Sequence, residues 1–63
     1  MKNVIVFITD KNECEMFKEI CEEGFEESVK RDLQRHLDVA KNNPAYYHFI
    51  DVPTAKIVVR RFD

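Results

Sequence analysis

The sequence predicts an α/β (α+β) domain with the element order β-α-α-β-β, a three-stranded mixed sheet and helices packed mainly on one face. Three observations lead to this fold class. Residues 4–8 form an uninterrupted apolar run, residues 13–41 carry apolar positions at helical spacing, and residues 46–52 and 56–62 are rich in β-branched and aromatic types.

The first strand is expected at Val4 to Ile8 (VIVFI), which is apolar at every position. Successive side chains of a strand point to opposite faces, so Val4, Val6 and Ile8 need one cover while Ile5 and Phe7 need another. A chain of 63 residues has little material for two covers. The sequence therefore predicts a second layer, or a partner, on the second face.

A first helix is expected from residue 13 to about residue 23. Residues 9–12 (TDKN) provide capping side chains before it, since Asp10 with Glu13, or Asn12 with Glu15, would bind the free amides of a helix start. The apolar residues then recur at spacings of three, four and seven, as one stripe of a helix; they are Cys14, Phe17, Ile20 and Cys21.

Gly24, the only glycine in the chain, is expected to separate this helix from a second one at about 25–41. On one straight helix the first stripe would point away from the stripe of the second segment, so a single rigid helix could not present both stripes to one sheet. A single kinked helix is the alternative. Asn42, Asn43 and Pro44 end the helical region.

Two further strands are expected at 46–52 (YYHFIDV) and 56–62 (KIVVRRF), joined by a turn at 53–55 into an antiparallel hairpin. The third strand is favoured for the middle of the sheet, because Ile57 to Val59 is a second uninterrupted β-branched run. The second strand in the middle is the alternative.

Alternation along these strands indicates a candidate binding face. Which residues share a face depends on register, because a shift by one residue exchanges the two sets. In the expected pairing, the uncovered face carries aromatic side chains with Lys56 among them; the candidate binding residues are Phe7, Tyr47, Phe49, Arg60 and Phe62.

An apolar face of this kind is expected to bind a second copy of the chain, as a homodimer, or another protein. The second helix lying on that side would leave no open face. Single-stranded nucleic acid is the alternative partner, because exposed rings stack bases while Lys and Arg hold phosphates. A third interpretation uses the acidic residues of the expected first helix, Glu15, Glu19 and Glu22, to dock on a basic partner.

Residues that carry chemistry are sparse. Cys14, Cys21, His36 and His48 match no metal-binding spacing, and one glycine leaves no phosphate loop, so no catalytic residue, metal, cofactor or small-molecule substrate is expected. No segment resembles an export signal or a membrane span, and the net charge is −2. The sequence therefore predicts one domain over residues 1–63, a cytoplasmic interaction or regulatory protein that is not an enzyme.

Overall fold

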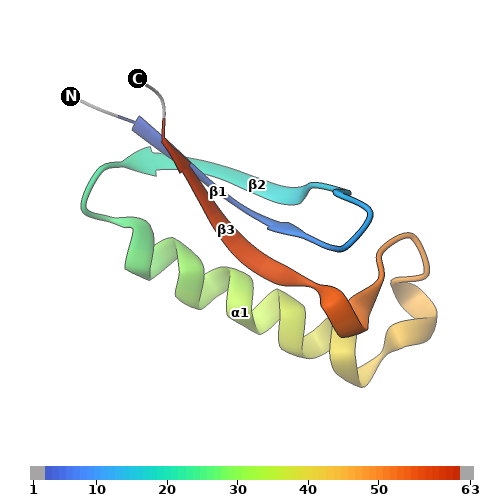
Figure 1. Ribbon diagram of the computed structural model, residues 1–63. Coiled ribbons are helices and arrows are strands. Elements are labelled where there is room, and N and C mark those ends of the chain that lie inside the picture. The colour runs from blue at the N-terminus through green and yellow to red at the C-terminus, as the bar shows by residue number, and fades with distance from the viewer. Residues whose placement is uncertain (1–2, 62–63) are drawn as a thin grey trace.

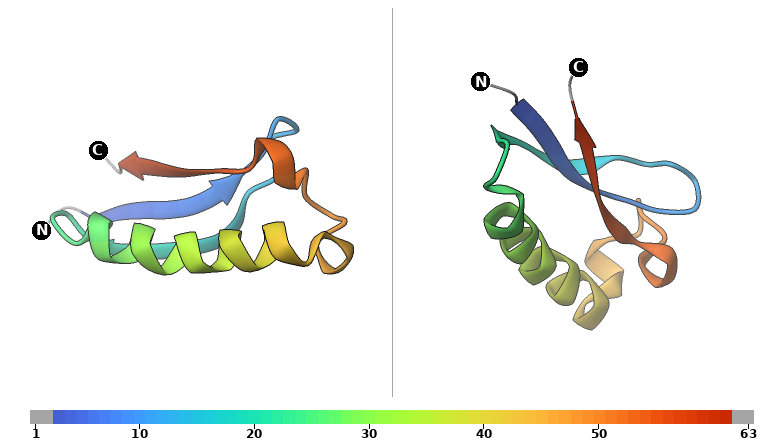
Figure 2. Two further views of the ribbon diagram at one scale, coloured as in Figure 1. Left: turned by 90° about the horizontal axis from the view of Figure 1, so that it is seen from below. Right: turned by 60° about the vertical axis from the view of Figure 1, so that its left-hand side comes forward.

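The computed structural model describes residues 3–61 and shows an α+β domain, with one helix beneath a three-stranded sheet (Figure 1). The elements are β1 (Asn3–Thr9), β2 (Met16–Glu22), α1 (Glu26–Asn42) and β3 (Lys56–Arg61), with short 3-10 turns at Pro44–Tyr46 and Val52–Thr54. The strand order is β2-β1-β3, and β1 is antiparallel to both neighbours. The helix and the sheet form two layers in both views of Figure 2.

The core lies between α1 and the inner face of the sheet, which is the face toward the helix. Val4, Val6 and Ile8 of β1 are almost completely buried there. Against Val6 and Ile8, the helix packs Leu33, Leu37 and Ala40. These positions recur at spacings of three and four, so they lie on one side of the helix.

The expected first helix at 13–23 is wrong, because these residues form the turn after β1 and then strand β2. The Asp10 carboxylate does not cap a helix; its Oδ1 accepts hydrogen bonds from the amides of Asn12 (2.9 Å) and Cys14 (3.1 Å), which bends the chain back. The returning strand then pairs with β1, with Val4 opposite Cys21 and Val6 opposite Glu19. Pairing with the apolar central strand outweighs the weak helical preference of this segment.

The expected strand at 46–52 is also wrong. This segment holds a 3-10 turn and bends, and it covers the end of the core with Ile50 and Val52, which are both buried. Aromatic and β-branched residues favour strands mainly because their side chains pack well there. In this segment Ile50 and Val52 are buried against the core without strand pairing.

The sheet is antiparallel, not mixed, and its central strand is β1, not the third strand or the second. β1 has the most apolar sequence of the three, so the position with a neighbour on each side goes to the strand that buries most. The third strand itself is confirmed over Lys56–Arg61.

The helix expected at about 25–41 is confirmed as α1 (Glu26–Asn42), but the break between two helices and the single kinked helix are both wrong, because strand β2 precedes Gly24 and the element order is β-β-α-β. Gly24 has φ +107°, a conformation that side-chain-bearing residues rarely adopt. Its amide donates to the Glu26 carboxylate, and Glu26 with Glu27 places negative charge at the start of the helix. Gly24 therefore lies in the turn between strand β2 and helix α1, and not between two helices.

Asp10 also joins two parts of the chain that are distant in sequence. Its second carboxylate oxygen accepts the amide of Asp51 at 2.7 Å, and the amide of Lys11 donates to the Thr54 hydroxyl at 3.1 Å. The hairpin loop therefore lies beside the segment that precedes β3, as Figure 1 shows at one end of the molecule.

Candidate functional site

The predicted binding residues do not form one surface. Phe7 and Arg60 lie together on the outer face of the sheet, the face away from α1. Tyr47 is half-buried against the core and Phe49 is exposed beside it, with ring centroids 5.9 Å apart, and both belong to the irregular segment before β3. Phe62 lies outside the described residues.

Charged side chains cover the outer face at Phe7, whereas Ile20, which pairs with Ile5, stays exposed on the same face. The Arg60 guanidinium lies 4.8 Å from the centroid of the Phe7 ring, and Phe7 is only 2% exposed. Glu15 holds Arg60 by an ion pair of 2.8 Å and binds Lys18 at 3.1 Å. The aromatic ring that the sequence places on an open face therefore lies beneath the guanidinium of an arginine.

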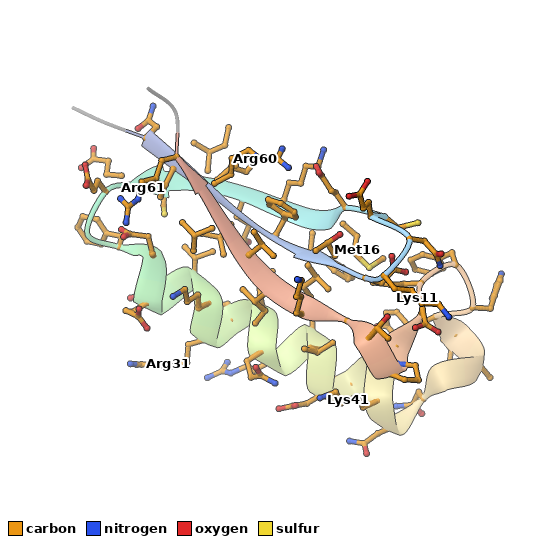
Figure 3. All side chains as sticks on the ribbon, in the orientation of Figure 1. Lys11, Met16, Arg31, Lys41, Arg60 and Arg61 are labelled. Carbon is orange, nitrogen blue, oxygen red and sulfur yellow. The ribbon has the colours of Figure 1, made fainter. Side chains whose placement is uncertain are left out.

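The charges around this cover affect Glu15 directly. Its hydrogen bonds with Arg60 and Lys18 hold the pKa of the Glu15 carboxyl below its ordinary value. Beside it lies an open hollow of about 510 Å³ lined by side chains of both signs, among them Lys11, Glu13 and Lys56. Mixed charge in a wide hollow provides no focused site for an anion or a cation. Figure 3 shows Arg60 on the side of the sheet away from α1 and Arg61 near the turn that begins the helix.

Exposed apolar side chains gather instead on the side of the molecule formed by β2 and the neighbouring flank of α1. We call this region the β2 surface and define its apolar members as Phe17, Ile20, Phe25 and Val39. Ile20 is 66% exposed in the middle of β2, and Phe25, 59% exposed, directly precedes the helix. Among residues 3–61, β2 is an edge strand with β1 on one side only, so its other side carries backbone groups that no described strand pairs with.

A bulge shapes the first half of β2. The register with β1 shifts between Val6 and Ile8, and Phe17 adopts φ 54°, which is rare for a bulky residue. Its ring stacks on His36 of α1, with centroids 4.7 Å apart and an interplanar angle of 11°. The bulge thus turns an aromatic side chain onto the helix at the edge of the sheet.

A groove follows this edge between β2 and α1. It encloses about 400 Å³ and is lined by Glu19 from the strand and by four residues of the helix: Asp32, Arg35, His36 and Val39. The groove combines an apolar side chain with opposite charges, so it fits a polypeptide better than an apolar small molecule.

The sequence did not predict the β2 surface, because residues 13–23 were expected to be helical. Residues 17–22 show no alternation of apolar and polar side chains, so the only signal was the turn-forming run TDKN after the first strand, which is typical of a hairpin.

Other kinds of site find little support. Within residues 3–61, no group of three or more His, Cys, Asp or Glu side chains could hold a metal ion. Burial is the main cause of a raised pKa at the Cys21 thiol. A higher thiol pKa means that a smaller fraction of Cys21 is present as the reactive thiolate. In the same part of the chain, no helix has the length and apolar character needed to cross a membrane.

Comparison of the chain with protein-family models, with curated proteins and with solved structures finds no match.

Proposed function

We propose that this protein acts by binding another polypeptide chain through the β2 surface, as a non-catalytic interaction or regulatory protein. The observation that carries the proposal is the exposed Ile20 at the centre of an edge strand, with a groove between that strand and α1. An edge strand next to a groove is the arrangement that accepts an added strand, in which main-chain hydrogen bonds supply affinity and neighbouring pockets supply specificity.

The geometry favours the β2 edge over the part of the outer face around Phe7, although Ile20, which pairs with Ile5, points to that same face. Phe7 lies beneath Arg60, so a partner would first have to displace an arginine that Glu15 already holds. Ile20, by contrast, contributes little to the core and is ready for contact. Burial of an exposed aliphatic side chain of this size stabilises a complex by roughly 1.5 to 3 kcal/mol.

Binding of single-stranded nucleic acid is less supported for the same reason. Base stacking on a sheet requires an exposed ring face there, and the Phe7 ring is covered, whereas the exposed Phe49 belongs to the irregular segment before β3. Arg60 and Arg61 are also engaged by acidic partners, Glu15 and Glu23, at 2.8 and 3.1 Å. Docking through an acidic helix face loses its basis, since Glu15, Glu19 and Glu22 lie on the hairpin loop and on β2 rather than on one helix.

A cytoplasmic location belongs to the same proposal. Cys14 and Cys21 are both free thiols, and free thiols persist in a reducing compartment.

The test is site-specific photo-cross-linking in the cells that naturally produce the protein. A photo-reactive amino acid at position 20 should attach the chain to a polypeptide, while the same amino acid at position 31 should not, because Arg31 lies on the side of α1 away from the sheet (Figure 3). Equal capture from both positions, or no capture from position 20, would contradict the proposal.

A further inference from the structure

We infer that the occupant of the β2 surface is a second copy of this chain, which pairs β2 with β2 in an antiparallel register centred on Ile20. The inference rests on the proposed function and names its partner. Symmetric dimers are the commonest protein assemblies, and two antiparallel edge strands are related by a two-fold axis normal to the sheet.

The charges of β2 are self-complementary in this register. With Ile20 on the axis, Lys18 of each copy lies opposite Glu22 of the other, so two ion pairs flank an Ile20 to Ile20 contact on the outer face. Lys18 already contacts Glu15 at 3.1 Å, which keeps its side chain on that face, while Glu22 is exposed.

Other registers are unfavourable. A pairing centred on Lys18, on Glu19 or on Glu22 places that charged residue opposite its own copy. A pairing centred on Cys21 brings Glu19 opposite Glu23 on both sides of the axis. Among the residues 18–22, only Ile20 gives a register without like charges directly opposed and with two opposite-charge pairs.

The opposite edge of the sheet does not offer the same complementarity. β3 carries Lys56, Arg60 and Arg61 and contains no acidic residue, so no register of β3 with itself forms an ion pair across the axis. Positive charge on an edge strand discourages pairing between copies. The two edges therefore differ in a way that selects one mode of assembly.

The groove supports the same partner. A two-fold axis normal to the sheet places both α1 helices on one side of a continuous six-stranded sheet and brings the two grooves together at the seam. Asp32, Arg35 and the exposed Val39, which line each groove, would then lie near the seam, with opposite charges available for the second copy.

Charge reversal with purified protein tests the register. Lys18→Glu and Glu22→Lys each replace two ion pairs by two like-charge pairs, so each variant alone should dimerise roughly tenfold more weakly or worse. Their equimolar mixture should recover the dimer, because every pair in the mixed dimer joins a lysine to a glutamate. Sedimentation velocity over a range of concentrations measures each species.

Two further variants separate this effect from loss of the fold. Ile20→Lys places two lysines on the axis and should give a chain that is folded by circular dichroism and monomeric by sedimentation velocity. Arg31→Glu reverses a charge on the helix away from β2 and should leave the wild-type dimer unchanged.

Wild-type chain that sediments as a monomer at every concentration would overturn the inference, as would single reversals that dimerise like wild type. A monomeric chain whose position 20 still cross-links to a different polypeptide would overturn the second copy while leaving the proposed function intact. A dimer that Ile20→Lys leaves intact would show that the copies meet elsewhere and would overturn the register.

Discussion

On the inner face of the sheet, Val6 and Ile8 lie against the aliphatic side chains of α1, whereas on the outer face Phe7 lies beneath the guanidinium of Arg60, which Glu15 holds in place. The side chains on the inner face are covered by a helix. The Phe7 ring on the outer face is covered by Arg60 from β3, which is held by Glu15 from the hairpin loop. A small chain can thus bury one face of its central strand with a helix and cover part of the other face, here Phe7, with long charged side chains, while Ile5 on that face stays half-buried.

The inner face should be the more sensitive to truncation. Leu33 is 1% exposed, so Leu33→Ala should lower the free energy of unfolding by about 2 to 5 kcal/mol through lost burial and an unfilled cavity. Val39→Ala on the same helix is the control, with a change within about 0.5 kcal/mol because Val39 is exposed. Urea unfolding of both variants would decide, and similar losses would contradict the comparison.

Asp10 should rank second, because it holds the loop that carries Glu15. Asp10→Ala removes the acceptor of three backbone amides, those of Asn12, Cys14 and Asp51. We expect a fall in Tm smaller than that of Leu33→Ala and larger than that of any outer-face variant. Hydrogen exchange should show faster exchange at Cys14 and Asp51, and unchanged rates there would argue against this role.

Arg60 gives the third and smaller effect. Arg60→Ala uncovers the Phe7 ring and should cost about 1 kcal/mol of stability. Arg60→Met keeps an apolar stem over the ring and removes the charge, so it should recover part of the loss. If Met performs no better than Ala in thermal unfolding, the ring is covered by charge alone.

The smallest loss of stability is expected from lowering the pH. It should come from protonation of Glu15, which holds Arg60 on the outer face, and of Asp10 in the hairpin loop. Hydrogen bonding lowers the folded-state pKa of Asp10, first through the Asp51 amide, and that of Glu15, first through Arg60. The unfolded chain therefore takes up protons first as the pH falls. The stabilisation that the Asp10 and Glu15 carboxylates provide is complete near neutral pH and declines below about pH 5. It is lost as the pH falls through their folded-state pKa values.

Thermal unfolding from pH 7 to pH 3 measures this dependence. Asp10→Asn and Glu15→Gln should each flatten the acid limb, whereas Leu33→Ala should lower the whole curve without changing its shape. An acid limb of wild-type steepness in both carboxyl variants would assign the dependence to other groups.

The sequence correctly predicted the elements whose apolar residues follow the spacing of the structure that they form. The run at 4–8 is apolar at every position, and the helix after Gly24 has its apolar residues on one stripe, so both were found close to their observed bounds. The segment 16–22 could not be assigned in this way. Ile20 is its only β-branched residue, and its strand conformation comes from pairing with β1, which no local window contains.

The candidate site residues were also predicted only in part. Alternation placed Phe7 and Arg60 in one set, and the register of β1 with β3 brings them to one face. It could not show that Arg60 covers Phe7, because that depends on Glu15, a residue expected on a helix. Tyr47 and Phe49 were misplaced because the segment 46–52 is not a strand. The β2 surface was missed for the corresponding reason at residues 13–23.

The position of β1 at the centre of the sheet has a consequence for synthesis. β1 is made before both of its neighbours, and one of them, β3, follows it by nearly the whole described chain. The hairpin with β2 can form early from local contacts, but the other side of the most apolar strand stays unpaired until residues 56–61 leave the ribosome. Premature termination within that last strand would release a chain with an open apolar edge, the kind of product that aggregates.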